Sequence, residues 1–109
     1  MREIKTYRAV LDGRYEAIVA APSAAAAARA MDVTPGFLRD RGGVTGNQEQ
    51  IAMATAEPGC VFLRVSSLMT APYIKVAPGE GIRPALSLLR ERQERAWAER
   101  RGAKDEPMA

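Results

Sequence analysis

The sequence contains no histidine and a single cysteine, Cys60, and both scarcities restrict its chemistry. Without histidine there is no Ser-His-Asp or Cys-His nucleophile system and no imidazole metal ligand. One cysteine forms neither a disulfide framework nor a cysteine zinc cluster, and this usage is typical of a reducing compartment. We therefore expect a cytoplasmic binding protein rather than an enzyme, with no cofactor and no metal.

Long apolar segments and a strong charge of one sign are also missing. The longest stretch of small apolar residues, 17–31, is mostly alanine and is interrupted by Pro22, Ser23 and Arg29. It falls short of the roughly 20 apolar residues that span a bilayer, so we expect no membrane association. The charged residues 1–5 predict no secretory signal. The net charge of +3 is spread along the chain and permits nucleic-acid binding without requiring it.

The 109 residues suffice for one domain, which we predict over 1–101, with a flexible tail at 102–109. Asp12-Gly13 between two β-prone runs predicts a hairpin over residues 4–20, because a type I′ turn requires positive φ at both central positions. We expect one face of this hairpin to pack and the other to face water. Further strands are predicted at 60–65 and 73–76, joined by a loop over 66–72.

Three short helices are predicted between the hairpin and the strand at 60–65. Ser23 is the expected N-cap of an alanine-rich first helix. Thr34-Pro35 begins the second, which Gly42-Gly43 ends, and the third runs from Gln48 to Ala56. With a long C-terminal helix, this order predicts an α+β fold in which the hairpin and the strand at 60–65 form an antiparallel sheet.

Residues 23–42 have the spacing of a helix-turn-helix motif. Such a unit requires a small residue where the helices approach, a tight turn, an apolar residue closing it, an N-cap and an apolar anchor. These places are occupied in order by Ala28, Asp32, Val33, Thr34 and Leu38. Asp32 stands where such motifs usually carry glycine, so the positive φ is borne by a residue that tolerates it less well.

The motif predicts a nucleic-acid surface, since the arginines of its second helix can reach base edges or phosphates and the next helix start carries amide donors. We assign five residues to this surface: Thr34, Arg39, Arg41, Asn47 and Gln48. Two short helices joined by a capped turn also occur merely to cover a sheet, and Asp40 opposes a phosphate backbone. A purely structural role therefore stays open.

Four segments between residues 5 and 64 carry a resemblance to other proteins: Tyr15 to Ser23, the alanine helix, Thr45-Gly46-Asn47, and Ala56 to Val61. Together they resemble small uncharacterised proteins of bacteria, phages and plasmids, which share a β-hairpin, a helix-turn-helix-like unit and a Thr-Gly-Asn turn. The resemblance implies no established activity. Small proteins of mobile elements include anti-CRISPR inhibitors, and the size of this chain suits that class.

The longest helical pattern lies at residues 84–101. Leu86, Leu89, Gln93, Ala96 and Trp97 fall within one stripe, and oppositely charged residues stand four apart on the rest of the helix. We assign Leu86, Leu89, Arg90 and Trp97 to an interface. The stripe can pack against the protein's own domain or against a second copy in a homodimer. Alternatively, Trp97, with Arg83, Arg90 and Arg101 near one edge of the stripe, can stack on a base or an arginine.

The leading hypothesis is a small regulatory protein that acts on nucleic acid or a nucleoprotein complex through the helix-turn-helix-like unit. The alternative is a phage or mobile-element inhibitor or adaptor, anti-CRISPR-like, that acts by protein–protein binding. Binding to phosphates weakens steeply with salt, whereas a packed protein interface changes less. If the arginines of the second and the C-terminal helices lie on separate faces, the nucleic-acid hypothesis loses its continuous patch.

Overall fold

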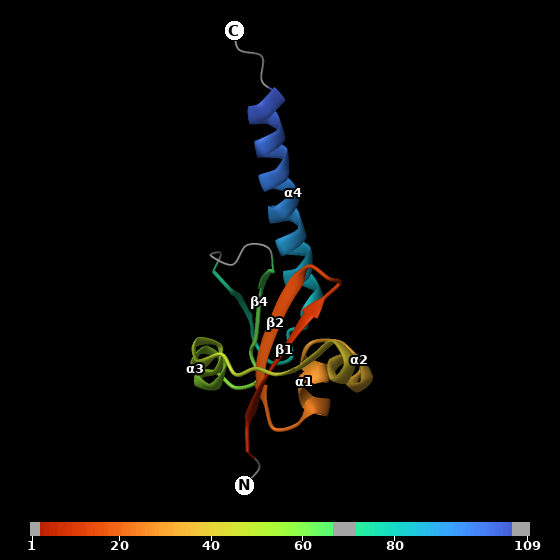
Figure 1. Ribbon diagram of the computed structural model, residues 1–109, viewed down its shortest axis with the longest axis vertical. Coiled ribbons are helices and arrows are strands. Elements are labelled where there is room, and N and C mark those ends of the chain that lie inside the picture. The colour runs from red at the N-terminus through yellow and green to blue at the C-terminus, as the bar shows by residue number, and fades with distance from the viewer. Residues whose placement is uncertain (1–2, 67–71, 106–109) are drawn as a thin grey trace.

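The computed structural model describes residues 3–66 and 72–105 and has an α+β fold, as the sequence predicts (Figure 1). Five antiparallel strands pair in the order β3-β1-β2-β4-β5: β1 (Lys5–Leu11), β2 (Tyr15–Ala21), β3 (Gly42–Val44), β4 (Val61–Val65) and β5 (Ile74–Val76). The helices are α1 (Ala24–Ala30), α2 (Pro35–Arg41), α3 (Gln48–Ala56) and α4 (Arg83–Asp105). The pairing of the hairpin with the strand near residues 60–65 is confirmed.

The β1–β2 turn has the expected left-handed geometry. Asp12 and Gly13 have φ of 52° and 65°, and the Arg14 amide donates to the Leu11 carbonyl over 3.0 Å. Leu11 pairs with Tyr15, so Arg14 stands as an extra residue outside the ladder. The turn therefore presents the Arg14 side chain to solvent at the tip of the hairpin.

The expectation that one face of the hairpin meets water is wrong for β2, which is buried along its whole length. Ala17 and Val19 point into a large core beneath α1, α2 and α4, whereas Ile18 and Ala20 pack on the other face with Ala54 of α3. Because β2 lies between β1 and β4 and helices cover both faces of the sheet, neither row of side chains reaches solvent.

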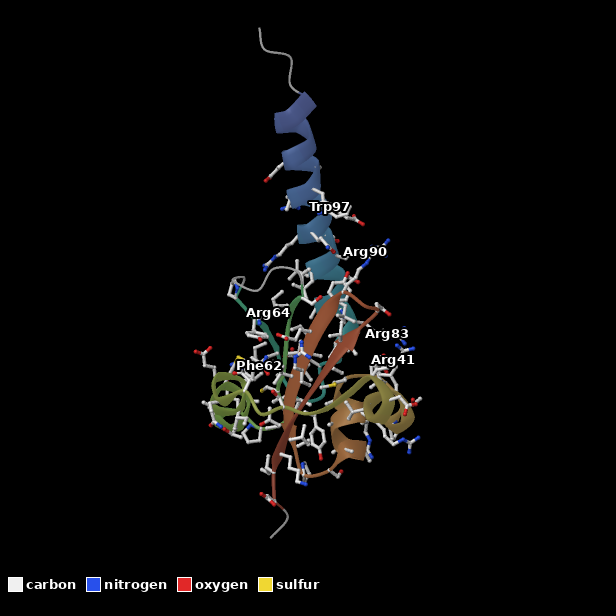
Figure 2. All side chains as sticks on the ribbon, viewed as in Figure 1. Arg41, Phe62, Arg64, Arg83, Arg90 and Trp97 are labelled. Atoms are coloured by element: carbon white, nitrogen blue, oxygen red, sulfur yellow. The ribbon has the colours of Figure 1, made fainter. Side chains whose placement is uncertain are left out.

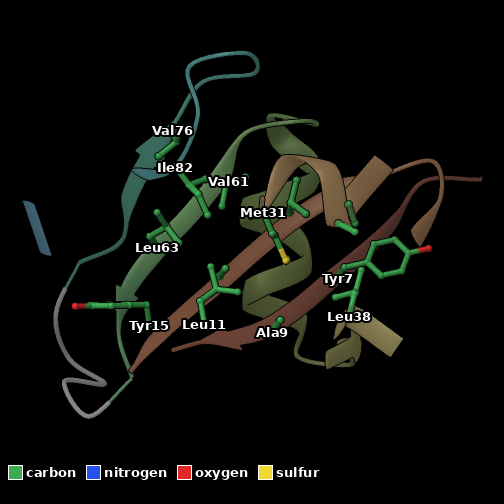
Figure 3. Close-up of a cluster of buried hydrophobic side chains, with 14 of the residues drawn as sticks. Tyr7, Ala9, Leu11, Tyr15, Met31, Leu38, Val61, Leu63, Val76 and Ile82 are labelled. Carbon is green, nitrogen blue, oxygen red and sulfur yellow. The ribbon is translucent and has the colours of Figure 1, made fainter. Parts of the chain in front are cut away.

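The larger core explains the alanines of α1 (Figure 3). Ala27 and Ala28 are fully buried, and their small side chains let α1 approach the sheet closely. Met31, at the end of α1, and Leu38 of α2 fill the space between the helices and the strands, with exposed fractions of 0% and 2%. The helix-turn-helix-like unit is thus anchored to the sheet by both of its helices.

Strand β3 is an element that the sequence did not predict, because Gly42-Gly43 was interpreted only as the end of a helix. Gly42 pairs with Ala9 and Gly43 with Arg8, so the chain passes directly from α2 to the edge of the sheet. A Cβ at position 42 would lie 2.5 Å from the Arg8 carbonyl oxygen and 2.9 Å from a Leu38 methyl group. Glycine is required there by close approach.

Helix α4 packs on the sheet only near its start, through the buried Ile82, just before it, and Leu89. Its 23 residues extend for about 34 Å, and the later turns project from the body (Figure 1). It continues to Asp105, into the segment 102–109 for which a flexible tail is predicted. Residues 67–71 of the predicted loop and 106–109 of the predicted tail lie outside the described residues. In the part described, no helix has the length and apolar character to span a membrane.

Candidate nucleic-acid interface

The turn between α1 and α2 has the hydrogen bonds of a Schellman motif. The amide of Val33 donates to the Ala28 carbonyl over 2.9 Å, and that of Asp32 to the Arg29 carbonyl over 3.2 Å. Asp32 adopts φ of 55°, the left-handed conformation that the helix-turn-helix spacing requires there. Val33 then packs against the core and closes the turn.

Thr34 caps α2 and is occupied by that role. Its Oγ1 accepts a hydrogen bond from the Phe37 amide over 3.0 Å, and Pro35 follows in the first helical turn. Leu38 faces the core, so the last turn of α2 directs Arg39 and Arg41 outward, and both are exposed. The expected cap and apolar anchor are thus found in one seven-residue helix, and its two arginines are exposed.

The two arginines of α2 are weakly engaged within the protein. Arg39 Nε lies 3.7 Å from the Asp40 carboxylate, and both side chains are more than two-thirds exposed, at 79% and 71%. Among residues 3–66 and 72–99, Arg41 has no hydrogen bond or ion pair from its side chain. Exposed pairs of this kind contribute little to stability, so both guanidinium groups are available to a ligand.

Asn47 and Gln48 lie apart from this surface. They begin α3, which packs through Ala54 on the opposite face of the sheet from α1 and α2 (Figure 1). Asn47 Oδ1 accepts from the Gln50 amide over 3.1 Å, as an N-cap does. The five residues assigned to one nucleic-acid surface therefore divide into two groups, and only Thr34, Arg39 and Arg41 stay together.

The four residues of α4 that were assigned to an interface also fall into two groups, one packed on the domain and one exposed. Leu89 is buried in the core and Leu86 packs against it, so both hold the helix to its own domain. Arg90 is exposed and bonds Glu94 one turn later over 3.2 Å. Trp97 is 59% exposed on the projecting part of the helix (Figure 2). A second copy would find only Arg90 and Trp97 free of the domain.

A buried carboxylate on the α3 face of the sheet was missed by the sequence reasoning. Glu16 of β2 is 5% exposed. Its Oε2 accepts from Arg8 on β1 over 2.8 Å, and its Oε1 accepts from Arg64 on β4 over 2.9 Å. The Tyr73 hydroxyl donates to the same Oε1 over 2.5 Å. We call these four residues the Glu16 cluster.

The pKa values in the Glu16 cluster follow from burial and charge. Burial alone would raise the pKa of Glu16, but hydrogen bonds from Tyr73 and Arg8 and the charges of Arg8 and Arg64 outweigh it and lower that pKa. Burial and the neighbouring carboxylate raise the pKa of Tyr73. The Arg64 guanidinium also lies 4.3 Å from the centre of the Tyr73 ring, and Gln50 bonds the Tyr73 hydroxyl from α3.

The cluster neutralises cations on the α3 side of the sheet. One carboxylate serves Arg8 and Arg64, and Glu57 bonds Lys75 over 2.8 Å nearby. A small pocket of about 180 Å³ adjoins Gln50, Arg64 and Tyr73. Over residues 3–66 and 72–99, no three acidic or cysteine side chains group as metal ligands.

The only sequence signal for the cluster was a glutamate among apolar residues of a strand. Its partners lie 8, 48 and 57 residues away, and although the sequence predicts that the hairpin pairs with the strand at 60–65, nothing local indicates the register that places Arg64 opposite Glu16. No family model, curated protein or solved structure matches this chain.

Proposed function

We propose that this protein is a small regulatory binding protein, without catalytic chemistry of its own, that contacts the phosphate backbone of nucleic acid or a nucleoprotein complex through α1 and α2. The observation that carries the proposal is the outward pair Arg39 and Arg41 on the second helix of a capped helix-turn-helix-like unit. Arginine binds phosphate through several donors at once, so two such side chains on a rigid helix suit this target.

The distribution of charge supports the choice of this side of the sheet. On the α3 side, Arg8, Arg64 and Lys75 are each bonded to a carboxylate within 3 Å. On the other side, Arg39 has only a loose contact with Asp40, and Arg41 has no ion pair within the described residues. The arginines of α2 are therefore among the cations that remain free to meet phosphates, whereas those on the α3 side of the sheet are not.

The start of α4 adds further arginines to the same side. Arg83 bonds Asp32 of the α1–α2 turn over 2.8 Å, and this ion pair joins the start of α4 to the helix-turn-helix-like unit. Arg41, Arg83 and Arg90 all lie on the side of the body turned away from α3 (Figure 2). The Asp32–Arg83 bond therefore supports a basic surface that continues from the helix-turn-helix-like unit to the start of α4.

The test compares a double variant, Arg39→Gln with Arg41→Gln, with a control that carries Arg92→Gln and Arg95→Gln. All four arginines are exposed, and glutamine keeps helix propensity while it removes charge. Affinity for duplex and single-stranded DNA and RNA is measured between about 50 and 200 mM salt. We expect the α2 double variant to lower the slope of log affinity against log salt by about 1.8 for duplex DNA, and the control to change it little.

Equal affinity and equal salt dependence for the wild-type protein and the α2 double variant would show that α2 does not contact the nucleic acid. Absence of salt-dependent binding by the wild-type protein to any of the four probes would reject the nucleic-acid function altogether.

A second function, binding of a protein partner as an inhibitor or adaptor, is favoured by Trp97. A tryptophan that is 59% exposed on a projecting helix is the type of residue that anchors protein interfaces. It is the only tryptophan of the chain, so its fluorescence reports its surroundings directly. A shift in Trp97 emission between low and high micromolar protein, together with a larger molecular size that Trp97→Ala abolishes in a sizing experiment, would identify a second copy of the chain as the partner at this surface.

A further inference from the structure

A groove lies between the hairpin tip, the α1–α2 turn and the start of α4. Its volume is about 740 Å³, within the range of ligand-binding clefts. The hairpin contributes Asp12 and Arg14, the turn contributes Asp32, and α4 contributes Arg83 and Arg90. The hairpin and α4, which are distant in the sequence, therefore bring three arginines to one depression beside Asp12 and Asp32.

The floor of the groove offers only a limited apolar surface to a ligand. Tyr15, Met31 and Ile82 line it with exposed fractions of only 4%, 0% and 2%, and the partly buried Val33 and Leu86 add a small apolar area. An apolar ligand or an amphipathic helix would gain little burial there, because area already removed from water contributes nothing further. The groove therefore recognises its ligand by charge, through its rim.

The rim arginines are held loosely or not at all. Arg14 has no hydrogen bond or ion pair from its side chain within residues 3–66 and 72–99. Arg83 bonds Asp32, but the two side chains are 85% and 52% exposed. Arg90 bonds Glu94 with both side chains 67% exposed. Exposed pairs are weak, and a guanidinium has five N–H donors, so each arginine can also bind an anion.

We propose that this groove binds phosphate groups of the same nucleic acid that α2 contacts, with Arg14 and Arg83 as its principal ligands and Asp32 as an internal competitor. The inference rests on the proposed function for the identity of the ligand. It follows from three observations: a depression of suitable size, a rim of free or weakly paired arginines, and the Asp32–Arg83 bond that joins the groove to the α1–α2 turn. Asp32 thereby limits affinity while it shapes the turn.

Two substitutions with opposite expected effects test the groove. Arg14→Gln removes a phosphate ligand, and we expect the salt slope on duplex DNA to fall by about 0.9. Asp32→Asn keeps a residue that tolerates positive φ, removes the competing charge and frees Arg83, and we expect tighter binding with a slope steeper by about 0.9. Glu49→Gln on α3 is the matched control for Asp32→Asn, because each removes one negative charge, and Arg92→Gln on α4 is the matched control for Arg14→Gln, because each removes one positive charge.

The outcomes separate the groove from the proposed function. Weaker binding by Arg14→Gln together with tighter binding by Asp32→Asn, each beyond the effect of its matched control, would support the groove. If the α2 double variant loses affinity while neither groove variant differs from its control, the groove is rejected and the proposed function stands. If the groove variants respond and the α2 double variant does not, the groove stands and α2 is rejected. Unchanged thermal unfolding of each variant shows that the fold is retained.

Discussion

Replacement of Glu16 by glutamine tests how strongly the Glu16 cluster stabilises the fold. The carboxylate is 5% exposed and receives hydrogen bonds from Arg8, Arg64 and Tyr73. Glutamine has nearly the same shape, but it carries no charge and turns an N–H group toward one of the arginines. The variant therefore leaves two guanidinium groups without their counter-ion in a partly buried site.

The size of the effect depends on how far the arginines can reach water. Removal of one partner from a fully buried ion pair costs about 3 to 5 kcal/mol. The Arg64 side chain is only 14% exposed, whereas that of Arg8 is 41% exposed and can be rehydrated. We therefore expect the lower end, about 3 kcal/mol of unfolding free energy, which for a domain of this size lowers the Tm by about 12 °C.

Two control variants test whether the burial and the charge of Glu16 cause the loss of stability. Glu57→Gln breaks a pair of the same length, 2.8 Å, whose side chains are 47% and 49% exposed, and we expect no resolvable loss of stability. Tyr73→Phe removes one hydrogen bond to the Glu16 carboxylate and is expected to cost about 1.5 kcal/mol, because the accepting group is charged. Urea unfolding followed by circular dichroism measures all three variants. A loss for Glu16→Gln no larger than that for Tyr73→Phe would refute the reasoning.

The stability difference between the wild-type protein and Glu16→Gln should also depend on pH. The folded-state pKa of Glu16 is lowered, so the carboxylate contributes its full stabilisation above the unfolded value of about 4.3. That contribution is lost as the pH falls through the lower folded-state pKa. The difference in unfolding free energy between wild type and Glu16→Gln should therefore shrink as the pH falls from 7 toward 3. A constant difference over this range would show that the charge of Glu16 is not the source of the effect.

Two further predictions concern the backbone. Gly42→Ala should lower the free energy of unfolding in urea by about 2 kcal/mol, because its Cβ would lie 2.5 Å from the Arg8 carbonyl oxygen. Gly43→Ala has open space around its Cβ and should cost much less, so equal losses would contradict the close-approach explanation. Asp32→Ala should lower the free energy of unfolding by about 1 kcal/mol, because alanine is disfavoured at φ of 55°. Glycine adopts this conformation freely, so Asp32→Gly should be more stable than Asp32→Ala. The reverse order would show that side-chain contacts, and not φ, decide the effect.

Local signals predicted most of the secondary structure because each depends on a few neighbouring residues. Asp12-Gly13 specifies a left-handed turn, and Ser23, Thr34 and Asn47 each accept the backbone hydrogen bond that begins a helix. Strand β3 escaped prediction because a three-residue strand has no periodicity of its own. Its existence depends on the free edge of β1, which lies more than 30 residues earlier in the chain.

In the candidate interface, too, features that depend on neighbouring residues were predicted, and features that depend on tertiary structure were not. The sequence alone predicted the helix-turn-helix spacing and the outward arginines of α2, since cap, anchor and exposed positions follow from helical geometry. It assigned Asn47 and Gln48 to the same surface because they are near in the chain. The structure separates them, because β3 carries the chain across the sheet edge before α3 begins on the opposite face.

The sequence by itself determined the absence of histidine chemistry, the α+β order of elements, and the turns and caps at which most of them begin. Only the tertiary structure decided which charges meet. It buried Glu16 between Arg8 and Arg64, and it brought Arg14, Arg83 and Asp32 to one groove. Strand register and helix placement have to be known before any of these pairs can be inferred, because they join residues separated by 8 to 69 positions and no local pattern encodes them.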